Sequence, residues 1–230
     1  MTTTSPRATC TRRVFYPDSD GKPMAETDVH ADVMTDSKEG LRGYFAKRPD
    51  VYVSGNNFVY FEEGNPRARV SPDVYVVFGA AMRQRSSYKC WEEDGRLPSV
   101  VIEITSRKTK NEDIVTKYAL YQRLGIHEYI LFDPTGTHLK DQRLRGYRLD
   151  EAGKYQPIAH TEERLFSEEL YLELFGEGTR LRFYDPTNFT LLPTPSELRR
   201  QAAREKQRAD SAEARVTELL AELERLKENS

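Results

Sequence analysis

The sequence has few cysteines and no long apolar run, and each shortage excludes a class of protein. Its two cysteines, Cys10 and Cys90, are too few for a disulfide framework or a cysteine-rich zinc site. No stretch approaches the roughly 18 consecutive apolar residues that a membrane-spanning helix requires. The N-terminal region also lacks the apolar core of a signal peptide. We therefore expect a soluble, cytoplasmic protein with no membrane partner.

The chain also lacks a strong net charge. It carries 35 Lys and Arg residues against 37 Asp and Glu residues, which gives a net charge of -2 at pH 7. Such a balance provides no overall cationic field to attract nucleic acid, so a nucleic-acid role requires local basic patches or a bound metal ion. The length of 230 residues suits one good-sized domain with an extension.

Composition divides the chain into three segments. Residues 1–15 are rich in Thr and Arg without periodicity, which is typical of a flexible tail. Residues 16–192 contain the strand and helix patterns of a single domain. Residues 193–230 follow a proline-rich boundary and predict a long helix, capped near Ser196 and forming a coiled coil. A single solvated helix is the alternative.

The coiled-coil interpretation rests on apolar residues at steps of three and four. These residues are Leu198, Ala202, Ala209, Ala212, Val216, Leu219, Leu223 and Leu226. Glu205 interrupts one core position, and the core is alanine-rich early and leucine-rich late. We expect a homodimer formed through this helix, or pairing with another coiled-coil protein.

Apolar runs between turn signals predict the strands and helices of the domain. The expected strands are 51–53, 58–61, 74–79, 100–104, 129–132, 144–149, 154–158 and 181–184. The expected helices are 24–45 and 111–124, and Gly125 is a C-cap candidate for the second helix. We expect the last three strands to extend the same domain.

One carboxylate inside an apolar strand is the most informative feature. Glu103 lies in the run Val100–Ile104, where a charged group is costly unless it is paired or binds a metal ion. Asp73 comes directly before the apolar run Val74–Val77. If the two strands are antiparallel neighbours, both carboxylates meet at one edge of the sheet. Two carboxylates, water and a backbone carbonyl make an oxygen site suited to Mg²⁺ or Mn²⁺.

The helix after this strand presents a lysine on the same face as two other polar groups. Asp113, Lys117 and Tyr121 recur every four residues. Lys117 would stabilise negative charge on a phosphate or orient an attacking water. An ion pair between Glu103 and Lys117 without catalysis is the alternative. Tyr121 either lines the site or is a core aromatic.

Basic residues near these motifs are candidates for contacts with nucleic acid. They are Arg83, Arg85, Arg107, Lys108 and Lys110. Contacts of this kind with phosphates position a duplex without reading its bases. A solvated charged loop is the alternative interpretation.

The order of five motifs resembles the Uma2 family of the PD-(D/E)XK nuclease superfamily. The motifs are YPDSDGKPMAETDVH, VYVSGN, SPDVYVVFG, VVIEITSRKT and DIVTKYALYQRLGIHEYILFDP. The resemblance covers most of the chain from Tyr16 and includes the alanine- and glutamate-rich C-terminal helix. It implies an α/β (α+β), restriction-endonuclease-like fold, with a mixed β-sheet flanked by helices and a long C-terminal helix.

The resemblance also assigns roles to the acids. Asp73 corresponds to the first acid of the family pattern and Glu103 to the central acid, and both would hold the metal ion. Glu26 resembles the further acid that the superfamily often supplies from its first helix. From spacing alone, Glu26 and His30 equally fit a solvated pair at a helix start.

The lysine of the family pattern is displaced in this chain. The pattern places it two residues after the central acid, where this sequence has Thr105. The resemblance implies that Lys117, on the following helix, takes that role. Lys108 and Lys110 compete for it.

These observations predict a Mg²⁺- or Mn²⁺-dependent endonuclease that hydrolyses DNA. Two alternatives remain open from the sequence. One is a nuclease-fold module that binds nucleic acid or protein without turnover, and the other is a phosphodiesterase for RNA or a small nucleotide.

Overall fold

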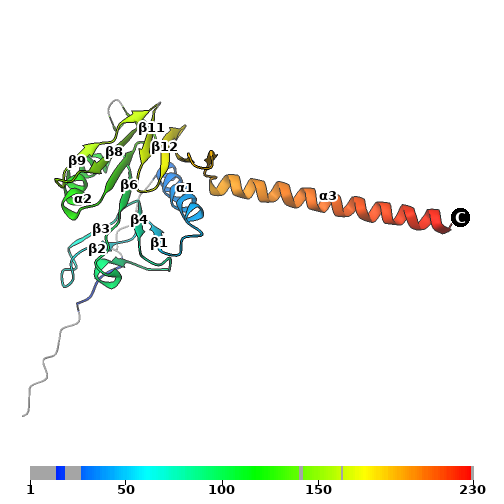
Figure 1. Ribbon diagram of the computed structural model, residues 1–230, viewed down its shortest axis with the longest axis horizontal. Coiled ribbons are helices and arrows are strands. Elements are labelled where there is room, and N and C mark those ends of the chain that lie inside the picture. The colour runs from blue at the N-terminus through cyan, green and yellow to red at the C-terminus, as the bar shows by residue number, and fades with distance from the viewer. Residues whose placement is uncertain (1–13, 19–26, 140–141, 162, 229–230) are drawn as a thin grey trace, which may run out of the picture.

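The computed structural model describes residues 14–18, 27–139, 142–161 and 163–228. These residues form a globular body of β-sheets and helices, from which the single helix α3 (Pro195–Glu228) projects (Figure 1). No helix in the described part of the chain is long and apolar enough to span a membrane.

A six-stranded mixed sheet forms the centre of the body. Its order is β1 (Val51–Ser54), β4 (Val74–Phe78), β6 (Val100–Ile104), β7 (Glu128–Phe132), β8 (Leu144–Leu149) and β9 (Tyr155–Pro157). Strands β6 and β7 are parallel, and every other neighbouring pair in this sheet is antiparallel. The chain between the parallel strands crosses over through a helical segment, as a parallel pair requires.

The two faces of this sheet are covered by different elements. Helix α1 (Asp28–Tyr44) packs on the face that carries Ile102. Helix α2 (Tyr118–Leu124) packs on the face that carries Val101, and Gly125 ends it with φ +75° as predicted. Figure 1 shows α1 and α2 on opposite sides of the sheet. Because side chains alternate along a strand, Glu103 points to the α2 face with Val101.

A second, five-stranded antiparallel sheet packs against α1 and against β8 of the central sheet. Its order is β10 (His160–Thr161), β11 (Arg164–Ser167), β12 (Leu172–Glu177), β13 (Arg180–Asp185) and β14 (Thr190–Leu191). It shares one hydrophobic core with α1 and the central sheet, through buried residues such as Leu174 and Phe183. A small third sheet joins β3 (Arg69–Val70), β2 (Val59–Tyr60) and β5 (Tyr88–Lys89).

These sheets confirm the expected α+β class, with a mixed sheet flanked by helices and a long C-terminal helix. The three late strands lie in two sheets, because β8 and β9 join the central sheet whereas β13 belongs to the second. Strands β10, β11, β12 and β14 were not predicted, since such short or half-exposed segments carry a weak apolar pattern.

The cap of helix α3 lies two residues before the predicted one. Thr194 Oγ1 accepts a hydrogen bond from Glu197 N at 3.3 Å, and Glu197 Oε2 accepts one from Thr194 N at 2.8 Å. This reciprocal pair is a capping box, and Pro195 occupies the first helical position, where its missing N–H has no cost. The cap is therefore Thr194 rather than Ser196.

Candidate active site

Asp73 and Glu103 lie side by side on neighbouring strands. Strands β4 and β6 are antiparallel, with Val74 opposite Ile102, so the condition set by the sequence pattern is met. The backbone N–H of Asp73 donates to Glu103 Oε2 at 3.4 Å, and Asp73 Oδ2 accepts from the backbone N–H of Ile104 at 2.7 Å. Two acids 30 residues apart in the sequence are thereby held side by side, where the start of β4 meets the end of β6.

The helical crossover brings Lys117 and Tyr121 onto the Glu103 carboxylate. Lys117 Nζ lies 2.7 Å from Glu103 Oε2 and 3.2 Å from Asp113 Oδ1. The Tyr121 hydroxyl donates to Glu103 Oε1 at 2.7 Å. Asp113, Lys117 and Tyr121 are all buried, so Glu103 has both of its oxygens in hydrogen bonds away from bulk water. Tyr121 is thus both a core aromatic and a partner of the candidate site.

The segment that carries Asp113 and Lys117 is a π-helix rather than a regular α-helix. It spans Glu112–Lys117 and continues directly into α2. Single π turns are rare and are found disproportionately at functional sites. The sequence predicted a regular helix over 111–124, and nothing in its apolar pattern indicates the wider turn.

The ionisation of Glu103 and Lys117 is set by their burial and mutual attraction. Burial raises the pKa of Glu103 above its ordinary value, the Lys117 charge opposes this, and nearby Asp73 and Asp113 add to it. Burial acts to lower the pKa of Lys117, but the carboxylates of Glu103 and Asp113 outweigh it and raise that pKa. Lys117 is therefore a cation at neutral pH.

Asp73 has the opposite character from Glu103. Burial alone would raise its pKa, but the hydrogen bond from His30 and the charge of Lys117 outweigh burial and lower it. One acid of the pair is thus held ionised while the other resists ionisation. Such a separation of two adjacent carboxyl groups is common at catalytic sites.

His30 is a member of this group that sequence analysis missed. Its Nε2 atom lies 3.3 Å from Asp73 Oδ1, and the residue is buried on α1. The sequence linked His30 only to Glu26, and Glu26 lies outside the described residues. A signal was present, because His30 stands three and four residues before the buried Val33 and Met34 and so shares their face.

A cavity of about 500 Å³ opens beside these groups. Asp73, His30 and Lys117 line it together with the cations Arg107 and Lys108. Glu103 is fully buried behind the lining residues. Tyr121 and Lys110 are not among the described residues that line this cavity. Of the three lysines considered for the catalytic role, Lys117 is the one that contacts Glu103, and Lys108 stands at the cavity wall.

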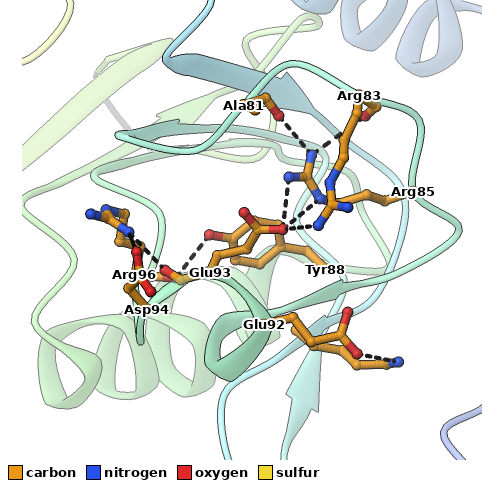
Figure 2. A network of polar contacts seen from close by, with 9 residues as sticks. Ala81, Arg83, Arg85, Tyr88, Glu92, Glu93, Asp94 and Arg96 are labelled. Carbon is orange, nitrogen blue, oxygen red and sulfur yellow. Dashed lines mark hydrogen bonds and ion pairs between the residues drawn. The ribbon is translucent and has the colours of Figure 1, made fainter.

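Arg83 and Arg85 lie in a different network, which Figure 2 shows from close by. Both donate to Glu93 Oε1, and Arg85 also donates to the carbonyl of Ala81 at 3.0 Å (Figure 2). The Arg85 guanidinium stacks 4.2 Å from the centroid of the Tyr52 ring. These arginines line a second cavity, of about 690 Å³. The basic residues that are close in sequence are thus divided between two places in the structure.

Fold and site together define an α+β protein whose mixed sheet carries an acid–acid–lysine cluster where the start of β4 meets the end of β6. The profile of the Uma2 family, described as "Putative restriction endonuclease", matches residues 13–180. The chain therefore belongs to the Uma2 family, and the resemblance seen in the motifs is confirmed.

A crystal structure from Anabaena variabilis, titled "a putative nuclease belonging to DUF820", has 14% sequence identity and a TM-score of 0.45. The similarity covers 65% of this chain and 76% of that chain. No curated protein matches the sequence significantly.

Proposed function

We propose that this chain is an endonuclease that hydrolyses DNA phosphodiester bonds with Mg²⁺ or Mn²⁺. One observation carries the proposal. Lys117 reaches Glu103 at 2.7 Å, directly beside Asp73, at the wall of a cavity that also holds Arg107 and Lys108. Two carboxylates and a cation that converge beneath a basic cavity suit an anionic phosphodiester better than a neutral substrate. Membership of a family of nuclease description supports the same conclusion.

The donor atoms at the site fit a hard divalent ion. Among the described residues, no group of three or more His, Cys, Asp or Glu side chains could hold a metal ion. That argues against a closed zinc-type site, but Mg²⁺ usually takes only one or two protein carboxylates and completes its shell with water and substrate phosphate. Asp73 and Glu103 would hold such an ion, which when bound would polarise the phosphate and lower the pKa of an attacking water.

Lys117 is the residue that would stabilise the developing charge. Its ammonium is held between Glu103 and Asp113, so its position is fixed before substrate arrives. A preorganised cation in a largely dry site stabilises a transition state more effectively than a mobile surface cation. His30 and Tyr121 would act as positioning residues, because each hydrogen-bonds or contacts one of the two acids.

Arg107 and Lys108 would hold phosphates that flank the scissile bond. Both are exposed at the cavity, directly after the strand that carries Glu103. Contacts of this kind add affinity without sequence preference, and binding weakens as salt concentration rises. The family pattern does not distinguish DNA from RNA, so both are included as test substrates.

The direct test is a cleavage assay with Mg²⁺ or Mn²⁺ on labelled duplex DNA, single-stranded DNA and RNA. We expect metal-dependent cleavage by the wild type and a loss of at least roughly a hundredfold in Asp73→Asn. Asp150→Asn is the matched control, because Asp150 is a half-buried residue at the turn between β8 and β9 and does not line the candidate site. Absence of cleavage by the wild type on every substrate, or equal cleavage by Asp73→Asn, would refute the proposal.

Titration calorimetry separates the enzyme from a binding module without turnover. If the chain is such an enzyme, titration with Mg²⁺ or Mn²⁺ gives a heat of binding, and Asp73→Asn abolishes it. A chain that binds DNA but takes up neither ion at millimolar concentration is a module instead.

A further inference from the structure

Helix α3 projects from the globular body, and almost all of its surface is exposed to solvent. It has 34 residues, which at roughly 1.5 Å per residue is about 50 Å of helix. All described side chains from Leu198 to Lys227 are exposed, and Figure 1 shows the helix extending away from the sheets. Its end nearest the body is fixed by the capping box and by Arg182, whose Nη1 donates to Glu197 Oε1 at 3.0 Å. The direction in which it projects is therefore anchored.

The distal half of α3 carries an apolar stripe. Val216, Leu219 and Leu223 are 56%, 42% and 52% exposed. With Ala209, Ala212 and Leu226 they occupy alternating steps of three and four, which is the a/d pattern of a coiled coil. Val216 is a β-branched residue at an a position and Leu219 and Leu226 are at d positions, a combination that favours two-stranded assembly.

The charges beside this stripe match those of an identical helix in parallel orientation. In a parallel pair, each g position faces the following e position of the partner. Arg208 then faces Glu213 of the second copy, and Glu222 faces Lys227 of the second copy. By two-fold symmetry each pair forms twice, and Arg215 faces the uncharged Leu220. No like charges meet over residues 208–227.

Antiparallel pairing fits the same residues less well. In that orientation g faces g and e faces e. If the two helices overlap over their whole length, with Ala202 at the level of Leu226 of the second copy, Glu213 and Arg215 each face their own symmetry mate. If only the distal halves overlap, the opposite-charge pair that forms at the g positions is Arg215 with Glu222. Charge complementarity thus favours the parallel arrangement.

We infer that residues 208–227 are a homodimerisation segment, in which two copies of this chain form a parallel, in-register coiled coil. Glu205, at a d position, ends the coiled coil on the side nearest the globular body, because two carboxylates would face each other there. Both globular bodies lie at the same end of the coil. The inference does not depend on the proposed nuclease activity.

Sedimentation analysis of the full chain tests the association. We expect twice the chain mass of 26.6 kDa for the wild type and a monomer for Leu223→Glu. Arg208→Glu should weaken dimerisation about tenfold, because two attractive pairs become repulsive, and adding Glu213→Arg should restore it. Arg204→Glu, outside the a, d, e and g positions, is the matched control and should have little effect. A monomeric wild type at tens of micromolar would overturn the inference.

Cysteine crosslinking tests the orientation. Leu226→Cys, in a chain that also carries Cys10→Ser and Cys90→Ala, should oxidise to a covalent dimer, because position 226 meets itself in a parallel pair. In an antiparallel pair over residues 209–226 the two copies of position 226 lie roughly 25 Å apart along the helix axis. A dimer that forms no disulfide at this position would contradict the parallel arrangement.

Discussion

Lys117 reaches back from the helical crossover to Glu103 on strand β6, with Nζ 2.7 Å from Oε2. The contact links the π-helix to the central strand of the sheet. It also places a cation directly beside the carboxylate pair formed with Asp73.

Gly55 is required by the close packing of the backbone around Asp73. A Cβ at this position would lie 2.0 Å from the carbonyl oxygen of Asp73. We expect Gly55→Ala to displace Asp73 and reduce cleavage by roughly a hundredfold, as misplacement of about 1 Å can do. Gly40→Ala is the control, since nothing lies within 4 Å of its Cβ position. Cleavage rates at matched folded fractions check this, and unchanged activity in Gly55→Ala would show that the position of Asp73 is immaterial.

Asp113 positions Lys117 without lining the cavity. Its carboxylate lies 3.2 Å from Lys117 Nζ in the π-helical turn. Asp113→Asn keeps the shape of the side chain but removes the charge, so Lys117 has less to hold it in place. We expect kcat to fall about tenfold with KM nearly unchanged. A rise in KM at constant kcat would instead assign Asp113 to substrate binding.

Glu128 joins the two large sheets. The fully buried carboxylate on β7 accepts from Arg148 Nη2 at 2.8 Å and from the backbone N–H of Glu168 at 2.9 Å, just after β11. Arg148→Met leaves this carboxylate without its cation, and we expect the free energy of unfolding to fall by about 3 kcal/mol. Urea denaturation measures the change.

The control for this experiment is an ion pair of similar length nearer to water. Arg164 contacts Glu173 at 2.8 Å, and both side chains are about one-third exposed. Arg164→Met should cost less than about 1 kcal/mol. An equal loss of unfolding free energy in the two variants would mean that the burial of Glu128 does not strengthen the dependence on its ion pair.

The anchor of α3 should weaken in acid. The hydrogen bonds from Arg182, with those from Thr194, lower the pKa of Glu197 to about 2. A group whose pKa is lowered on folding stabilises the folded state above its unfolded pKa, and loses that effect as pH falls through the folded value. Stability of the wild type should therefore decline between about pH 4.5 and pH 2 more steeply than that of Glu197→Gln. Thermal melts across this range check the difference, and parallel curves would contradict it.

The strands of the central sheet and the proximity of Asp73 to Glu103 could be predicted from the sequence, for a physical reason. A carboxylate in an otherwise apolar strand is conspicuous because it needs a partner, and Glu103 has two side-chain partners, Lys117 and Tyr121. The antiparallel pairing of β4 with β6 then fixed the place of Asp73. Local pattern and tertiary structure agree at this point.

Other features depend on contacts that sequence spacing does not encode. The π-helix at Glu112–Lys117 is a small change in winding within an ordinary helical pattern. Arg83 and Arg85 both pair with Glu93 and do not line the cavity beside Asp73, because the path of their loop places them elsewhere. The second sheet is built from short strands whose burial comes from packing against α1. Tertiary context decides all three.

The most direct test of the proposed chemistry is the single-turnover rate of DNA cleavage by Lys117→Met, measured with saturating protein and Mg²⁺. Because Lys117 is buried, the rate is compared at a temperature where melting curves show the variant and wild type both folded, with Lys110→Met as the control. The proposal predicts a rate at least roughly a hundredfold below wild type for Lys117→Met and little change for Lys110→Met. A wild-type rate in folded Lys117→Met would contradict the account.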